Sequence, residues 1–130
     1  MEIKINDTHS ETWEVTEETL AANCGSGTVR VFSTPMMVAL MEYTAQNLMK
    51  KYLDEGYTSV GAAIETSHIS ATPLGMKVTS NCKVTEVSNK IVKFDVEAYD
   101  EKGLIGKGTH SRAIVHLEKF EKKAYEKLEK

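Results

Sequence analysis

A change of hydrophobic period near residue 58 constrains the fold of this chain more than any other feature. Residues 31–49 contain a single charged side chain, and their apolar residues recur at three- and four-residue intervals, which is the spacing of a helix face. Beyond the change, apolar and polar residues alternate as they do in strands. The alternating segments span residues 59–70, 76–87, 91–99 and 104–116.

The long helix is expected to begin near Pro35 and to end near Gly56, because proline is favoured in a first turn and Thr34 or Ser33 can cap the free amides. Its apolar residues occupy more than one face, so we expect other structure to wrap around it. One face carries Met37, Leu40, Met41, Thr44, Leu48 and Tyr52, and the other carries Val38, Ala39, Ala45 and Met49.

Three further elements complete the predicted order. A strand is expected at residues 11–15, followed by a short helix that Thr16 caps and that runs to about Cys24. A surface helix is expected at residues 118–130. Short turns between the four alternating segments predict an antiparallel meander.

The predicted architecture is α+β: an antiparallel sheet of about five strands wrapped around one long central helix, which is the hotdog arrangement. With 130 residues, the chain is expected to form one domain over residues 1–130. One helix leaves a sheet edge and apolar surface uncovered, so we expect a homodimer or a dimer of dimers.

Composition narrows the function. A net charge of −3 disfavours nucleic acid as a partner, and the polar residues within 31–49 disfavour a membrane span. The N-terminal residues lack the apolar core of a secretory signal, so a cytoplasmic protein is expected. Cys24 and Cys82 lack CxxC spacing and are expected to be reduced and mostly buried, and the histidines lack metal-ligand spacing. We therefore expect neither a metal nor a cofactor.

Glu42 is the most informative candidate residue. It is the only charge within residues 31–49 and has Met41, Val38, Ala45 and Met49 as helical neighbours. A carboxylate in apolar surroundings requires a partner or becomes a perturbed acid of the kind found at active sites. The alternative is an exposed glutamate or a structural ion pair.

Thr34 and His68 each have a structural and a functional interpretation. Thr34 can simply cap the long helix, or its hydroxyl can meet a substrate oxygen at the helix N-terminus. His68 ends the segment 59–70 and shares the predicted inward face of Val60, Ala62, Ile64 and Thr66. It is either a hydrogen-bonded core residue or a proton carrier with an ordinary pKa of about 6.5.

The spacing of Thr34 and Glu42 restricts how they can act together. Eight residues of helix separate them by about 12 Å, which is too far for direct contact. A common site requires either a bend after Thr34 or side chains from two subunits. Gly61 can ease strand packing or admit a bulky ligand, and Arg112 can be a surface charge or a phosphate clamp.

Four motifs resemble the fluoroacetyl-CoA thioesterase-like family of hotdog proteins. The resemblance covers residues 13–120 approximately and is carried by STPMMVALME at 33–42, VG at 60–61, TSHISATPLG at 66–75 and GTHSR at 108–112. It implies hydrolysis of an acyl-CoA substrate to a carboxylic acid and CoA. It also implies Thr34, Glu42 and His68 as the catalytic set, with Gly61 and Arg112 binding substrate.

One position departs from the family pattern. The resemblance implies an aromatic lid residue six positions before the catalytic threonine, where this chain has Thr28, and Phe32 is out of register. A general short- or medium-chain acyl-CoA is therefore expected rather than fluoroacetyl-CoA. Two alternatives stay open: a non-catalytic acyl-CoA or acyl-carrier binding module, and a hotdog dehydratase or hydratase.

Overall fold

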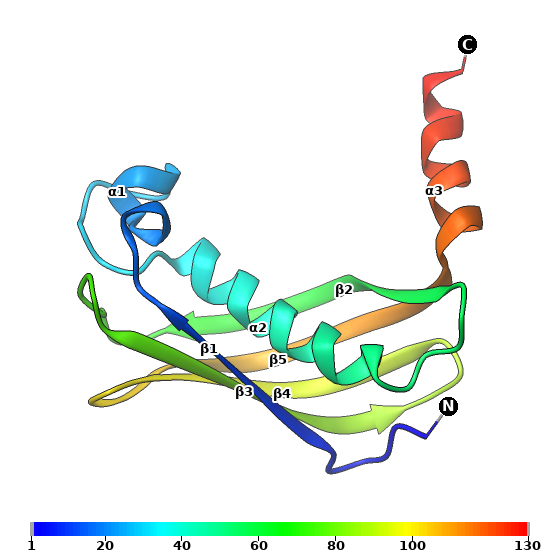
Figure 1. Cartoon of the computed structure of the whole chain (residues 1–130), viewed down its shortest axis with the longest axis horizontal. Coiled ribbons are helices and arrows are strands. Elements are labelled where there is room, and N and C mark those ends of the chain that lie inside the picture. Colours follow the sequence, from blue (N-terminus) through cyan, green and yellow to red (C-terminus); the bar gives the residue numbers. More distant parts are fainter. Residues whose placement is uncertain (1, 130) are drawn as a thin grey trace.

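A single long helix, α2 (Thr34–Lys50), crosses the concave side of a five-stranded antiparallel sheet in the computed structural model, which describes residues 2–129 (Figure 1). The predicted α+β class and the central helix are confirmed. The strands are β1 (Thr8–Glu14), β2 (Tyr57–His68), β3 (Lys77–Val87), β4 (Ile91–Asp100) and β5 (Gly103–His116).

The order of strands across the sheet is β1-β3-β4-β5-β2. Only β3, β4 and β5 form a meander, so the prediction that all four later strands do so is wrong. The segment before β3 is not a hairpin turn, because Phe32 donates its backbone N–H to the carbonyl of Thr72 and the Thr72 hydroxyl donates to Asp100. This segment crosses to the far side of the sheet and leaves β2 beside β5, as an edge strand.

Ser33 sets the start of α2. Its side chain accepts a hydrogen bond from the backbone N–H of Met36, so the cap is Ser33 and Thr34 is the first helical residue. The helix ends at Lys50, earlier than Gly56, because the Tyr52 N–H bonds to Met49 in a tighter turn. The buried helix residues are Met37, Leu40, Met41, Thr44, Ala45, Leu48 and Met49, and they pack on Val78, Val84, Phe94, Val96 and Ile105 of the sheet.

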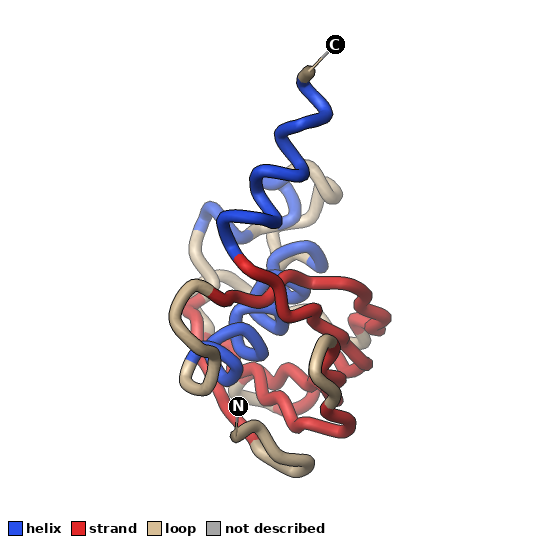
Figure 2. Tube along the Cα trace, turned by 90° about the vertical axis from the view of Figure 1, so that its right-hand side faces the viewer, coloured by secondary structure: helices blue, strands red, loops and turns tan. Residues whose placement is uncertain are grey.

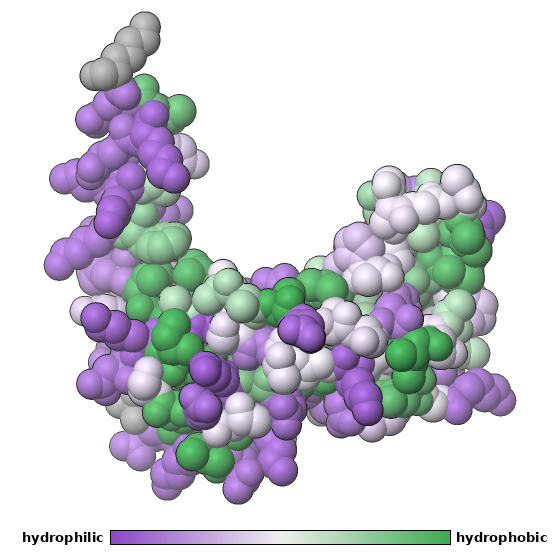
Figure 3. Space-filling view, turned by 180° about the vertical axis from the view of Figure 1, so that it is seen from behind, coloured by the Kyte–Doolittle hydropathy of each residue, from purple (hydrophilic) through white to green (hydrophobic). Residues whose placement is uncertain are grey.

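Small helical elements lie at both ends of the sheet. A 3-10 turn, η1 (Glu17–Thr19), precedes α1 (Ala21–Cys24), which ends at Gly25 with a positive φ of 80°. After β5, α3 (Leu117–Tyr125) and η2 (Glu126–Leu128) extend away from the sheet (Figures 1 and 2). From behind, the surface is hollowed between α3 and the lobe around α1 (Figure 3). Within residues 2–129, no helix has both the length and the apolar character that crossing a membrane requires.

A β-bulge in β2 changes which residues of this strand face α2. The pairing with β5 shifts between Gly61 and Ala63, so Ala62 is the extra residue. Ser59 and Gly61 consequently share the inward face with Ile64, Thr66 and His68. The prediction that Val60 and Ala62 face inward is therefore wrong, because simple alternation fails across a bulge.

Candidate active site

Thr34 and His68 meet where the start of α2 lies beside the end of β2. The Thr34 Oγ1 atom is 2.8 Å from Nδ1 of His68. Because Ser33 caps the helix, the Thr34 hydroxyl is not occupied by capping. The interpretation of Thr34 as a simple cap is therefore wrong, and its side chain is oriented by a histidine.

The imidazole of His68 is held on one side only. Its Nε2 atom is buried and has no hydrogen-bond partner within residues 2–129. Burial lowers the pKa of His68 below its ordinary value of 6.5, and this outweighs an opposing effect of the Ser70 backbone on the same pKa. The neutral imidazole is thus the favoured form near pH 7, with one nitrogen available for proton exchange with Thr34.

A pocket of about 350 Å³ borders the Thr34–His68 pair. Its volume is at the small end of the range for ligand pockets, which is about 300–1,000 Å³. Most of its walls are small or apolar: Ala21, Ser26, Gly27, Val29, Val31, Phe32, Ser33, Ile69, Ser70 and Ala71 join Thr34 and His68. The two polar side chains therefore face a space that suits a short apolar group.

Glu42 lies further along α2 and faces Arg112 of β5. The Glu42 Oε1 atom is 3.9 Å from Nη1 of Arg112, beyond hydrogen-bond length but close enough for charge attraction. The Glu42 side chain is 41% exposed, so the expectation that apolar neighbours surround it is wrong for a single chain. Its carboxylate is available to a ligand or to another subunit.

Arg112 is buried, with 4% of its surface exposed, so its interpretation as a surface charge is wrong. Its Nε and Nη2 atoms donate to the side chain and the carbonyl of Ser59, and Nη1 donates to His110. Sequence reasoning missed both Ser59 and His110. The spacing of His110 and Arg112 does place both on one strand face, but Ser59 faces them only because of the bulge.

Gly61 makes room for the Glu42 carboxylate. A Cβ atom at Gly61 would lie 2.6 Å from Glu42 Oε1, closer than real Cβ contacts allow. The same Cβ atom would lie 3.6 Å from His110 and 3.7 Å from Arg112. Gly61, Glu42, His110 and Arg112 therefore form one cluster.

The two groups of polar residues lie apart within one chain. Thr34 and Glu42 are on one uninterrupted helix and so are about 12 Å apart along its axis. Gly61 and His68 are separated by roughly 20 Å along β2. The alternative of a bend after Thr34 is wrong, because Thr34 is itself within the helix.

Neither cysteine belongs to these groups, and they differ in exposure. Cys82 is buried, as expected, whereas Cys24 is exposed, contrary to the expectation that both are mostly buried. Among residues 2–129, no cluster of three or more His, Cys, Asp or Glu side chains is arranged to hold a metal ion. The chemistry available to the site is that of a hydroxyl, a carboxylate, a guanidinium and two histidines.

Comparison with known proteins places the chain in a wider group. The family model described as fluoroacetyl-CoA-specific thioesterase matches residues 15–118. The chain is 42% identical over 97 residues to the fluoroacetyl-CoA thioesterase of Streptantibioticus cattleyicolor, covering 75% of this chain and 70% of the relative.

Solved structures agree with the sequence match. A structure of a fluoroacetyl-CoA thioesterase superposes with a TM-score of 0.92 at 32% identity, covering 96% of this chain and 97% of the other. A thioesterase superfamily member from Thermus thermophilus has a TM-score of 0.88 at 27% identity, covering 98% and 96%. These likenesses confirm the predicted hotdog fold.

Proposed function

Because the chain belongs to the fluoroacetyl-CoA-specific thioesterase family and is an acyl-CoA thioester hydrolase, we propose that Thr34, Glu42 and His68 carry out this hydrolysis. The hydrogen bond between Thr34 and His68, beside a pocket whose walls are mostly small or apolar, is the observation that supports this site best. Gly61 and Arg112, which surround the Glu42 carboxylate, are the proposed substrate-binding residues.

Thr34 and His68 act on the carbonyl oxygen of the thioester in this proposal. If Nδ1–H of His68 donates to Thr34 Oγ1, the threonine hydroxyl hydrogen is free to donate to that oxygen. Negative charge that develops on the oxygen is then stabilised by an oriented donor at a helix N-terminus. His68 fixes the direction of this donor.

Glu42 supplies the electron pair that begins the reaction. In the covalent route, its carboxylate attacks the carbonyl carbon, the C–S bond breaks, and CoA leaves as a thiolate that takes a proton. Water then cleaves the resulting anhydride, which releases the acid and restores Glu42. In the alternative route, Glu42 takes a proton from water while that water attacks the carbonyl. A single turnover in ¹⁸O-labelled water tests for the first route, because label enters the Glu42 carboxylate only when water attacks the Glu42 carbonyl of an anhydride.

The proposed acyl group is short or of medium length. Phe32, the aromatic residue nearest to the expected lid position, is buried and forms a β-bridge with Leu20, so it belongs to the core. Position 28 carries threonine. The pocket wall thus lacks the aromatic lid that the resemblance implies for a fluoroacetyl-specific enzyme.

The proposed active form is a homodimer, alone or within a dimer of dimers. The outer edge of β2 pairs with no strand of residues 2–129, and Gly61, Ala62 and Ala63 are exposed there. Antiparallel pairing of two β2 strands reverses one against the other. When this pairing is centred between Gly61 and His68, Gly61 of one copy lies near His68 of the second, which brings Glu42 toward Thr34 and His68 across the interface.

We place this dimer in the cytoplasm and assign all 130 residues to one domain. Acyl-CoA thioesters are intracellular metabolites, and both cysteines are free, which suits a reducing compartment. Cell fractionation with an antibody against the chain tests the location.

The test of the proposed function is a thiol-release assay over a panel of acyl-CoAs. We expect hydrolysis of short and medium chains, with turnover reduced about a hundredfold or more in Glu42→Ala and His68→Ala. Glu86→Ala and His9→Ala, which change a carboxylate and a histidine outside the two polar groups, serve as matched controls and should retain activity.

Three outcomes would overturn the proposal. Unchanged rates in both site variants would contradict the residue assignment. Saturable binding with an intact thioester would indicate a binding module instead. Loss of enoyl-thioester absorbance without release of thiol would indicate a hydratase.

A further inference from the structure

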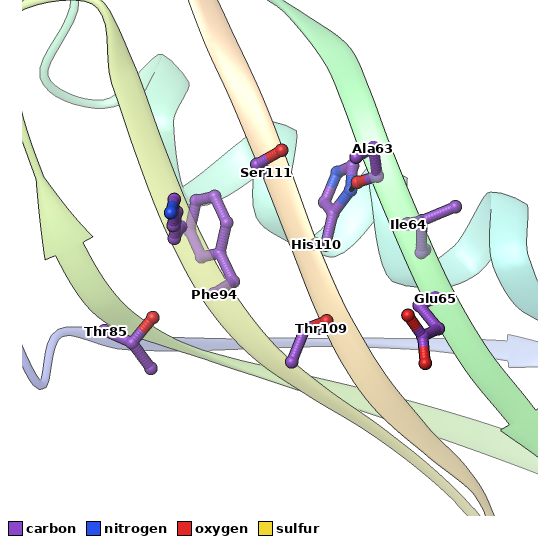
Figure 4. A pocket seen from close by; sticks show the side chains of 9 residues that line it. Ala63, Ile64, Glu65, Thr85, Phe94, Thr109, His110 and Ser111 are labelled. Carbon is purple, nitrogen blue, oxygen red and sulfur yellow. Dashed lines mark hydrogen bonds between the residues drawn. The ribbon is translucent and has the colours of Figure 1, made fainter.

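His110 is a buried histidine that the proposed reaction has not used. It lies on β5 with 3% of its surface exposed. Its Nδ1 atom is 2.7 Å from the carbonyl oxygen of Ala63, and its Nε2 atom is 3.2 Å from Nη1 of Arg112. Figure 4 shows the ring directed from β5 toward Ala63 on β2, with Phe94 on the neighbouring strand.

The two partners fix the protonation of His110. A guanidinium only donates, so Nε2 must accept from Arg112, and a carbonyl only accepts, so Nδ1 must carry the hydrogen. The imidazole is therefore neutral and in its Nδ1–H form. Burial lowers the pKa of His110, and the charge of Arg112 lowers it further, against opposing effects of the Ala63 carbonyl and Glu42.

We propose that His110 is a positioning residue whose neutral imidazole holds Arg112 at the correct distance from Glu42. The inference rests on the proposed function, in which Glu42 is the reacting carboxylate. Arg112 is held by Ser59 through Nε and Nη2, and by His110 through Nη1, the nitrogen nearest to Glu42.

The distance between Arg112 and Glu42 indicates the effect of the hydrogen bond from Arg112 to His110. At 3.9 Å, Nη1 attracts the carboxylate without forming a hydrogen bond to Oε1. Without the acceptor at His110, Nη1 is no longer held at this distance and can move into direct hydrogen-bond contact with Oε1, and this contact would occupy an oxygen that the reaction needs. The His110 hydrogen bond thus holds the positive charge of Arg112 beside Glu42 while it leaves the carboxylate oxygens accessible.

The same imidazole also stabilises the bulge of β2. Ala63, which accepts from Nδ1, directly follows the extra residue Ala62. The bulge turns Gly61 toward Glu42 and Ser59 toward Arg112. The His110 side chain therefore connects the cluster of Gly61, Glu42 and Arg112 to the backbone of the edge strand β2.

Two substitutions separate these two hydrogen bonds. In His110→Gln, the amide reaches the position of Nε2 and can still accept from Arg112, whereas in His110→Asn the shorter amide reaches only the position of Nδ1. Both variants lose the stacking of the ring on Phe94, whose centroid is 6.1 Å away, so they are matched for that contact.

We expect kcat to fall about tenfold or more in His110→Asn, with a smaller change in KM, and to recover to within about threefold of wild type in His110→Gln. The loss should disappear when His110→Asn is made in an Arg112→Gln background, because nothing is then left to position. Equal losses in both His110 variants, or losses that add to that of Arg112→Gln, would overturn the proposal. Thermal unfolding curves establish the temperature at which all variants are folded.

The unsubstituted protein gives an independent test. Long-range ¹H–¹⁵N spectra at neutral pH should show His110 in the neutral Nδ1–H form, and either the Nε2–H form or a charged ring would contradict the inference. This reading needs no turnover. If the wild type hydrolyses no acyl-CoA, the proposed function is wrong, but the spectra still test whether His110 accepts a hydrogen bond from Arg112.

Discussion

Thr34 and His68 are 34 residues apart in the chain, and their side chains meet at 2.8 Å. The first residue of α2 thus contacts the last residue of β2. The adjacent Ser33 caps the helix, so capping does not occupy the hydroxyl of Thr34, to which we assign the functional task.

This division of tasks predicts opposite effects at neighbouring positions. Thr34→Ala should reduce turnover on the order of a hundredfold and leave the melting temperature nearly unchanged, whereas Thr34→Ser should keep most activity. Ser33→Ala should destabilise the protein by about 1 kcal/mol, because a cap is lost. Turnover and thermal unfolding measured on all three variants test this; a large loss of stability in Thr34→Ala would contradict it.

A side chain at Gly61 should disturb the site without disturbing the fold. The added Cβ meets the end of the Glu42 side chain, which can swing away, so turnover should fall on the order of a hundredfold while the protein stays folded. Gly108→Ala is the contrast, because its Cβ would meet the backbone of Glu65. That variant should lose about 3 kcal/mol of stability. A Gly61→Ala enzyme with normal turnover would refute the placement of Glu42.

Stability should decrease below neutral pH. Burial lowers the pKa of both His68 and His110 in the folded state from the ordinary value of 6.5. Below pH 6.5 the unfolded chain therefore binds protons that the folded chain does not. The contribution of these histidines to the free energy of unfolding is complete above pH 6.5, and it decreases as the pH falls toward their pKa values in the folded state. Calorimetry from about pH 8 to pH 5 should show this slope. His68→Gln combined with His110→Gln should flatten it, and an unchanged slope would be evidence against the burial effect.

The two thiols should react at very different rates. Hydrogen bonds from Ser33 and Ser26 lower the pKa of the exposed Cys24, whereas burial raises the pKa of Cys82 to about 12. A thiol reagent at neutral pH should therefore modify one cysteine in the folded protein and both after denaturation. Cys24→Ser should abolish the native reaction. Rapid modification of Cys82 in the folded chain would contradict its burial.

The sequence predicts the elements well because their hydrophobic periods are strong. The four later strands and α2 lie close to their expected positions, since alternation and helical spacing report directly which faces are buried. Strand order was not predictable in the same way. The connection before β3 is held by contacts of Thr72 with Phe32 and Asp100, and such long-range contacts leave no periodic signal.

The candidate site was predictable only in part. Residue type and family resemblance suggested Thr34, Glu42 and His68 as candidates. The burial of Arg112 and its hydrogen bonds to Ser59 depend instead on one extra residue in β2. A bulge reverses the inward and outward positions beyond it, so period-two reasoning assigned Val60 to the wrong face.

In the proposed dimer, each active site is shared between two copies of the chain. Glu42→Ala and His68→Ala proteins should each be inactive, yet mixing them under conditions of subunit exchange should restore activity. Half of the dimers are then mixed and one of their two sites is intact, which gives about one quarter of wild-type turnover. A mixture no more active than its two separate components would contradict a site built from Glu42 of one copy and Thr34 and His68 of the other.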